Sequence, residues 1–564
     1  MINSGFAAIE STAIRPQHTL GMAPRPLLSV LMLVLSLSFG AGQAGAQCGS
    51  LSAPSTVWQN GGNSFWGLDG NWTSGTPNAS TNACILNGTS TVTLGGAGSA
   101  NALQLASGNS LIISGIGFAS LSLASGTSLN YGSIGLSTGA LIDTSGAFLI
   151  NNGTIGGGFF SSINNSGTFF NKSVIQLDAD SGLSNSAGAS FVNSGTISVD
   201  AGALVNEGTF NNRGTVNLTS QFDPSNFENS GTFNNRGTFN LSLIFNSSVF
   251  SNSGTLNNSG GINLIDSCFG ICSFTNSGTI NNRGTLNITT YPGSGGSFTN
   301  SGTVNNAGGT LSNALTSTID NTGTINNTFG AHLNNFGTLT NEGILNNTSG
   351  AHLMDAGTFN NTGMFSNSGA VTISNTGLFT TSTDYTQTAG RTIVNGTLTA
   401  TGGAIVDIEG GRLAGTGTIN GDVLMKGMMS PGSSGVPGTF AINGNYEQTS
   451  TGVFDEIIKG ASPNGVLDVT GVLALDPGSL LEITLRGGFD PVGDSFTILD
   501  YGSLTGEFAN GTSFFADGFN WTLTYGPNDA VLTAVSAPEP CTMPLIPIGF
   551  LALLGFAAKR RAAL

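Results

Sequence analysis

Through most of the chain, single apolar residues alternate with Thr, Asn and Ser in short blocks that Gly separates. Typical blocks are Thr232-Phe233-Asn234 and Thr285-Leu286-Asn287. Alternation of Thr with an apolar residue fits a strand whose pleated surface is buried on one side. Because Gly and Asn tolerate positive φ, we expect them to form the corners between strands. The pattern predicts many short strands joined by sharp corners.

The blocks recur with a regular period. A unit of 20 residues starts at Asn321 and returns at Asn341 and Asn361. Upstream, the paired motif N-x-G-T-h-N-N-x-G-T-h-N, in which h is an apolar residue, recurs in steps of 23, 23, 24 and 24 residues. Its first glycines are Gly208, Gly231, Gly254, Gly278 and Gly302. A period of 20 to 24 residues is that of one coil of a β-solenoid, with three strands and three corners per coil.

A single coil cannot bury its apolar side chains, whereas stacked coils can. Strands of successive coils would then pair in parallel at ~4.8 Å, so that like residues stack into ladders. We expect Asn at repeated corners to bond to Asn in the next coil, and Phe at inward positions to build the core. The chain has 35 Phe but only 6 Tyr. This ratio fits a dry core, because a buried Tyr hydroxyl would need a hydrogen-bond partner there. At about 22 residues per coil, residues 96–390 would make ~13 coils.

The N-terminal end has the order of a secretory signal peptide. An apolar run at 27–39 is followed by Ala44-Gly45-Ala46, an A-x-A cleavage site. The basic residues before the run are Arg15 and Arg25. Gln47, directly before Cys48, does not fit the lipobox of a lipoprotein. Both Met1 and Met22 remain candidates for the start of translation.

The C-terminal end carries three features in order: Pro538-Glu539-Pro540, an apolar run at 543–558, and a basic cluster. The cluster is Lys559, Arg560 and Arg561. This order resembles a PEP-CTERM sorting tail, which an exosortase recognises in many Gram-negative bacteria. The apolar run would form a helix of about 24 Å, slightly short for a ~30 Å hydrocarbon core, and the basic cluster would stay on the cytoplasmic side. The alternative is an ordinary membrane anchor.

Two further stretches resemble secreted repeat proteins of the autotransporter-passenger type. One contains Trp58, Trp66 and Trp72 in W-Q-N-G-G-N-S-F-W-G-L-D-G-N-W, and the other covers residues 412–510. We expect the tryptophans to cap the first coil, since an open solenoid end is an exposed strand edge. Stacking of the tryptophans on sugar is the alternative.

The predicted fold is therefore an all-β parallel β-solenoid, or β-helix, with a C-terminal β region and one C-terminal transmembrane segment. The predicted regions are a signal peptide (1–46), a Trp-rich cap (47–95), the solenoid repeats (96–390), a passenger-like β region (391–535) and the sorting tail (536–564).

The charge balance is strongly acidic. The chain has 14 Lys and Arg against 30 Asp and Glu. Removal of both predicted signals takes away five cations and Glu10, which leaves 9 cations, 29 acids and a net charge near −20. This balance excludes a basic nucleic-acid surface. It favours solubility and mutual repulsion outside the cell.

The five cysteines fit an oxidising compartment. Cys268 and Cys272 form C-F-G-I-C, which predicts a small disulfide rather than half of a metal site. A second predicted disulfide joins Cys48 to Cys84, which leaves Cys541 unpaired. Both pairings rest on spacing.

Residues for chemistry are few. The sequence lacks a nucleophile elbow, a P-loop, H-E-x-x-H and paired-cysteine zinc spacing. His332 and His352 hold equivalent places in adjacent units, but two nitrogen ligands without an acid or a cysteine make a poor metal site. The motif N-N-R-G-T supplies candidate contacts to an anionic glycan through charge-assisted hydrogen bonds. These candidates are Arg213, Arg236 and Arg283, with solvated corner residues as the alternative.

We therefore expect a non-catalytic, exported protein with a structural or adhesive role at the cell surface or in an extracellular matrix. The sorting-tail resemblance implies an exosortase-type membrane protease as one partner, passage through the inner membrane, and a biofilm or exopolysaccharide setting. Exopolysaccharide or cell-envelope glycan is the second expected partner, and no cofactor, metal or nucleic acid is expected. The alternative is a β-helix protein that binds or degrades polysaccharide. Degradation is disfavoured, because the repeats have one lysine, Lys172, and no tight acid cluster.

Overall fold

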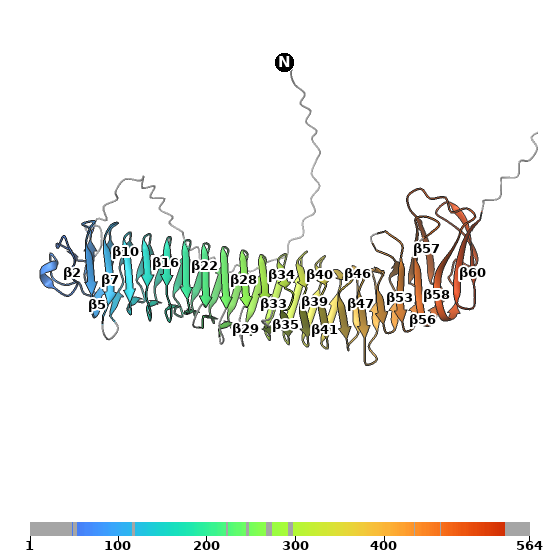
Figure 1. Cartoon of the computed structure of the whole chain (residues 1–564), viewed down its shortest axis with the longest axis horizontal. Coiled ribbons are helices and arrows are strands. Elements are labelled where there is room, and N and C mark those ends of the chain that lie inside the picture. Colours follow the sequence, from blue (N-terminus) through green and yellow to red (C-terminus); the bar gives the residue numbers. More distant parts are fainter. Residues whose placement is uncertain are drawn as a thin grey trace, which may run out of the picture. The chain divides into compact units, whose positions relative to one another are not determined.

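The computed structural model describes residues 48, 53–115, 119–220, 224–243, 248–266, 273–290, 297–433, 435–462 and 464–535. These residues form a parallel β-solenoid (Figure 1), which confirms the predicted all-β fold class. Among the described residues, no helix is both long and apolar enough to cross a membrane. The predicted transmembrane segment lies outside the described residues.

Each coil has three short strands. A typical coil consists of β24 (Thr232–Asn235), β25 (Thr238–Leu243) and β26 (Val249–Asn252). Each strand pairs in parallel with its equivalent in the next coil, so β24 pairs with β27 (Thr255–Asn258) and β25 with β28 (Gly261–Asp266). The predicted strand at Thr232 is therefore present, and its pairing follows the predicted period.

The strands line up as three faces, each a continuous parallel ladder. The first face runs from β3 (Asn82–Ile85) to β54 (Tyr446–Gln448), and the third from β5 (Ala97–Ala100) to β53 (Thr439–Asn443). The second face begins at β4 (Thr91–Leu94). Between residues 96 and 390 this face has thirteen strands, every third strand from β7 (Ser110–Ser114) to β43 (Ala370–Ile373), as the coil length predicts.

The coils continue beyond both ends of the predicted repeat region. β1 (Ser55–Val57) already pairs with β3, and the second face extends past residue 390 to β57 (Leu480–Leu485). Inward and outward residues keep alternating there although the Asn-Gly-Thr motif is lost. After β58 (Ser495–Gly506) the pairing becomes antiparallel, with β61 (Asp529–Val535) between β58 and β60 (Phe519–Tyr525).

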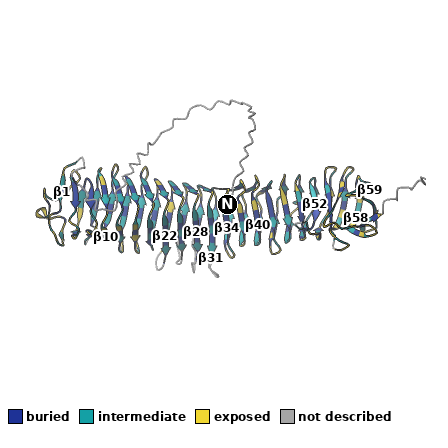
Figure 2. Ribbon diagram, turned by 90° about the horizontal axis from the view of Figure 1, so that it is seen from above, coloured by how far each residue is buried: buried dark blue, intermediate teal, exposed yellow. Residues whose placement is uncertain are grey.

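The apolar core runs through the inside of the coils, and Figure 2 shows the alternation of buried with less buried positions along the strands. Phe169, Phe191, Phe210 and Phe233 stack one above the other on the first face, with ring centroids 4.6, 4.8 and 5.0 Å apart. All four are fully buried. The phenylalanine ladder expected from the sequence is therefore present.

A second kind of ladder is polar and equally buried. On the third face, Asn185 donates from Nδ2 to Oδ1 of Asn206 at 2.7 Å, and Asn206 donates in the same way to Asn229 at 2.7 Å. Nδ2 of Asn206 also donates to the carbonyl of Thr232 at 3.1 Å. A buried amide is tolerated only when its polar atoms are paired, and the stacking supplies those partners. The expected Asn ladders thus lie inside the strand ends.

The glycines of the N-x-G-T corners serve a purpose other than the predicted one. Gly231 and Gly254 do not have positive φ. A Cβ on Gly254 would instead overlap the carbonyl oxygen of Gly231 in the preceding coil. The prediction that positive φ forms these corners was therefore wrong. Glycine is required because the backbones of successive coils approach too closely for a side chain.

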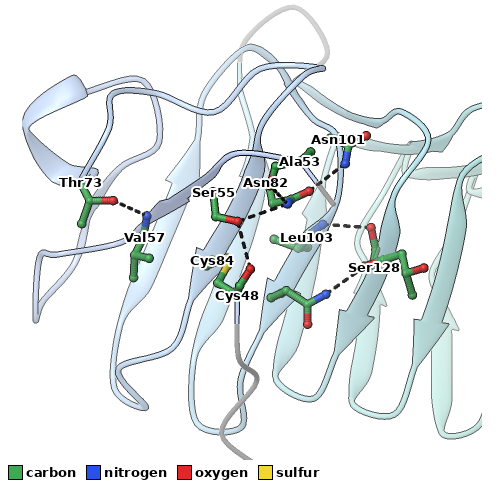
Figure 3. The surroundings of a disulfide bond; sticks show 12 residues. Cys48, Ala53, Ser55, Val57, Thr73, Asn82, Cys84, Asn101, Leu103 and Ser128 are labelled. Atoms are coloured by element: carbon green, nitrogen blue, oxygen red, sulfur yellow. Dashed lines mark hydrogen bonds between the residues drawn. A yellow bond between two sulfur atoms is a disulfide. The ribbon is translucent and has the colours of Figure 1, made fainter. Parts of the chain in front are cut away.

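The N-terminal end is held by a disulfide and by packed tryptophans. The structure joins Cys48 to Cys84, with Cα atoms 6.2 Å apart, and Ser55 Oγ donates to the carbonyl of Cys48 (Figure 3). The rings of Trp58, Trp66 and Trp72 meet edge to face at centroid distances of 5.1 and 5.0 Å, and all three are buried. Burial leaves no ring face for stacking on sugar.

Candidate anion-binding groove

The outer side of the second face carries a groove near its C-terminal end, with a volume of about 540 Å³. The strands beneath it are β46 (Arg391–Val394), β49 (Arg412–Gly415), β52 (Met428–Pro431), β55 (Val453–Ile458) and β57. The lining residues are Arg391, Ile393, Arg412, Ala414, Gly435, Ile457, Lys459 and Arg486. Four cations therefore surround a floor of small and aliphatic side chains.

Strand register places the cations as two pairs. Arg391 and Arg412 are the first residues of β46 and β49 and are direct partners in the ladder. At the opposite end of the strands, Lys459 follows Ile458, and the amide of Arg486 donates to the carbonyl of Ile458 at 2.8 Å. The groove thus runs obliquely across the face, from the starts of β46 and β49 to the ends of β55 and β57.

Arg412 is fixed by the strands around it. Its Nη2 donates to Ser430 Oγ at 2.6 Å and lies 3.7 Å from Asp455 Oδ2. Asp455 also accepts hydrogen bonds from Ser430 and Thr484. Arg412 Nε is buried and has no hydrogen-bond partner among the described residues. The Arg412 side chain is nonetheless 39% exposed, so the exposed part of its guanidinium can still donate to an anionic ligand.

The other three cations are exposed and, within the described part of the chain, form no salt bridge. They are Arg391, Lys459 and Arg486. The acidic side chains near the groove include Asp455, which Arg412 engages, Glu482, its exposed ladder partner, and Asp517, which accepts from the amide of Leu485. None of the three lines the groove. The groove therefore has an excess of positive charge.

This concentration contrasts with the rest of the molecule. The chain has a net charge of −16, and only nine of its Lys and Arg residues lie between residues 47 and 535. Four of those nine line the groove. A cleft of one sign with low-dielectric walls focuses the field and attracts the opposite charge, so the groove favours anions over cations.

A row of side chains leads into the groove along the starts of the second-face strands. The row passes through Thr310, His332, His352, Ala370, Arg391 and Arg412, one residue per coil. The imidazoles of His332 and His352 stack with centroids 5.0 Å apart and an interplanar angle of 13°. Burial, His332 and Arg391, in that order, lower the pKa of His352. Among the described residues, no group of three or more His, Cys, Asp or Glu is arranged to hold a metal.

The arginines predicted from the sequence lie elsewhere. Arg213, Arg236 and Arg283 are exposed at the corners between the first and second faces. Arg213 and Arg236 occupy adjacent coils, as expected, whereas Ser259 separates Arg236 from Arg283. They do not line the groove.

The groove cations were missed by sequence reasoning. The signal for one pair was available, because Arg391 and Arg412 are 21 residues apart, one coil, and each starts a strand. Lys459 and Arg486 follow β55 and β57 and stand outside the repeat motif.

Several predicted residues lie outside the described part of the chain. They are Cys268, Cys272, the sorting motif Pro538, Glu539 and Pro540, and the basic cluster Lys559, Arg560 and Arg561.

Neither a protein-family model nor a curated protein sequence matches the chain. Among solved structures, the chain is similar to the Haemophilus influenzae Hap adhesin, with a TM-score of 0.30 and 12% sequence identity. The match covers 82% of this chain and 65% of that one. A score this low supports no inference about function, which therefore has to be argued from the residues of this chain.

Proposed function

We propose that the chain is an exported, non-catalytic protein with a structural or adhesive role at the cell surface or in an extracellular matrix, where its groove holds an anionic polysaccharide. The observation that carries this proposal is the gathering of four of nine cations in one groove of an acidic solenoid. Arginine pairs well with carboxylates through two parallel hydrogen bonds, and uronic acids present carboxylates at regular intervals.

The environment of Asp455 supports binding rather than cleavage. Glycoside hydrolysis uses two carboxyl groups on opposite sides of the scissile bond, roughly 5 to 10 Å apart. The carboxylate oxygens of Asp455 accept hydrogen bonds from Ser430 and Thr484, and one of them lies 3.7 Å from Nη2 of Arg412. Its neighbour Glu456 is fully buried on the inner side of β55, so it does not supply the second group. Glu482 is the exposed ladder partner of Asp455, but neither of these two carboxyl groups lines the groove.

The binding proposal can be tested with two triple variants of equal charge. We expect Arg391→Gln/Lys459→Gln/Arg486→Gln in the purified full chain to lose affinity for polygalacturonate by tenfold or more, about 1.4 kcal/mol. The matched control removes the corner cations: Arg213→Gln/Arg236→Gln/Arg283→Gln. Neutral dextran should bind neither protein.

The outcomes separate the hypotheses. Equal loss in both triple variants would mean that only net charge matters, and loss in the control alone would favour the corner arginines. Absence of binding by the wild type would refute the proposal. Release of new reducing ends from polygalacturonate would support the polysaccharide-degrading alternative.

We further propose that an exosortase-type membrane protease sorts the chain at Pro538-Glu539-Pro540, with Lys559, Arg560 and Arg561 holding the tail on the cytoplasmic side. The resemblance of the tail supports this proposal. The test compares the mass and location of the wild type with those of Pro538→Ala/Glu539→Ala in the host. Loss of the tail only in the wild type is expected, and an uncut tail in both would contradict the proposal.

A further inference from the structure

The groove does not end at Arg391. A second hollow of about 380 Å³ lies beside it on the same face and shares Arg391 as a wall. Its lining residues are Gly350, His352, Ser368, Gly369, Ala370, Gly390 and Arg391. The two hollows are neighbours along the second face and are together called the furrow, and His332 stacks on His352 just beyond the second hollow.

We propose that the furrow holds one extended, carboxylate-bearing polysaccharide along the solenoid, from His332 to Arg486, rather than a short anion confined to the groove. This inference rests on the proposed function, because it requires that the groove binds anions. It adds the form of the ligand, its direction and a second set of contacts that the groove alone does not have.

The length of the furrow supports a polymer. Between β37 (His332–Asn335) and β57 the second face makes seven ladder steps. At ~4.8 Å per step this spans roughly 34 Å, far longer than a single sugar or a small organic acid. The cationic positions are spread along the whole span, so a short anion would reach only some of them.

The floor between the two ends suits a chain that lies flat. Ala370 and the neighbouring glycines have no large side chain to cross the furrow. Gly350 and Gly390 are exposed there, and the hydroxyl of the half-buried Ser368 can bond to a sugar hydroxyl. The floor of the groove itself consists of Ile393, Ala414 and Ile457, which can meet the apolar face of a sugar ring.

The two ends of the furrow differ in the permanence of their charge. Arginine and lysine, which as residue types keep their charge near neutral pH, line the groove. Histidine, the residue type whose charge changes between pH 5 and 8, stands at the other end. The charged groups facing His352 are His332 on β37 and Arg391 on β46. β43 between them has no titratable residue, and Asp355 at the end of β40 (His352–Asp355) points inward, where Asn335 donates to it.

Nucleic acid fits the furrow less well. DNA carries a phosphate charge about every 1.7 Å along its axis, and its binding relies on many phosphate contacts. Four permanent cations over the furrow of a chain with net charge −16 would leave most of those phosphates unpaired. A uronic-acid polymer carries fewer charges per unit length, which matches the sparse cations.

The test compares chain lengths with the purified full chain. We expect an oligogalacturonate dodecasaccharide to bind at least tenfold more tightly than the trisaccharide, about 1.4 kcal/mol. In His332→Gln/His352→Gln, the dodecasaccharide should lose affinity several-fold at about pH 5 and little at about pH 8. Trisaccharide affinity should be unchanged in that variant at either pH.

The results distinguish this inference from the function on which it rests. If both oligosaccharides bind equally and the histidine variant changes neither, the groove binds anions but the extended ligand is refuted. If neither oligosaccharide binds, the proposed function itself fails. Tighter binding of duplex DNA than of the dodecasaccharide would overturn the assignment to polysaccharide.

Discussion

Asp143 stands directly before the start of one of the buried Asn ladders, and replacing it with Asn should stabilise the solenoid. It ends β11 (Ala140–Asp143) on the third face, between Leu123 and Asn165 in the ladder. Both carboxylate oxygens are buried without a hydrogen-bond partner among the described residues. Burial raises the pKa of this carboxyl from 3.8 to about 7.

The direction of the ladder explains the expected gain. Each Asn donates from Nδ2 to Oδ1 of the next coil, as Asn165 does to Asn185 at 2.7 Å. An ionised Asp143 has no N–H to donate toward Asn165, whereas Asn at this position has one. A new buried hydrogen bond contributes about 1 kcal/mol.

The larger part of the gain depends on pH. With a pKa of about 7 in the folded state and 3.8 unfolded, the folded protein binds the proton more tightly than the unfolded chain. The wild type therefore loses stability as pH rises from about 4 to about 7, and the loss is complete above pH 7. A difference of about 3 pKa units corresponds to ~4 kcal/mol. Asp143→Asn has no such loss.

Local stability can be followed by hydrogen exchange of the amides of β11 and β14 (Ser162–Asn165). Protection should be greater in Asp143→Asn than in the wild type by about 1 kcal/mol near pH 4, and the advantage should grow to several kcal/mol near pH 8. Asp178→Asn, which changes an exposed acid by the same charge, is the control. An advantage that does not change with pH, or a less stable variant, would refute the reasoning.

Three further variants test the contacts between coils. Gly254→Ala should lower the free energy of unfolding in urea by about 1–3 kcal/mol, because the new Cβ overlaps the backbone of the preceding coil. Gly156→Ala, where a Cβ meets nothing within 4 Å, should have little effect. Equal effects of the two substitutions would contradict the close-approach argument. Asn229→Ala should cost about 3 kcal/mol, since Asn206 loses its 2.7 Å acceptor and the buried Oδ1 of Asn252 loses its donor; a neutral result by the same assay would show that the ladder contributes nothing. Cys48→Ser/Cys84→Ser removes the disulfide and should lower the free energy of unfolding by about 2–4 kcal/mol. Amide hydrogen exchange should rise first in the N-terminal coils. A uniform rise along the whole solenoid would argue against local stabilisation by this disulfide.

The coil could be predicted because its determinants are local and repeated. The motif at Gly231 and Gly254 sets the period, and alternation around Phe233 identifies the inward side. The reason for the glycines could not be read from the sequence, because it depends on a backbone that lies one coil away. Both a positive φ and a close approach of two backbones favour glycine, so the presence of glycine in the sequence does not distinguish the two causes.

The groove escaped prediction for a related reason. Arg412 and Lys459 come together only because their strands share one face. The ladder partner of Arg412 two coils later is Val453, which lies at the opposite end of β55 from Lys459. Once the corner insertions vary in length, equivalence along a face can no longer be counted. Sequence reasoning therefore selected the arginines of the repeated N-N-R-G-T motif and overlooked the cations that line the groove.

The buried Asn ladders give the solenoid a chemical direction. From Asn130 on the first face and Asn165 on the third, each buried Asn donates to the next coil along the chain, and the two series end on Gln387 and on Thr381. Each completed coil thus presents amide donors whose shortest hydrogen bonds form only with the following coil, as Asn206 does with Asn229 at 2.7 Å. If the chain is exported N-terminus first, the last folded coil would at every step offer its strand edges and amide donors to the segment that emerges next. Growth in that order buries each donor as soon as its acceptor arrives, so translocation and folding can proceed as one directional process.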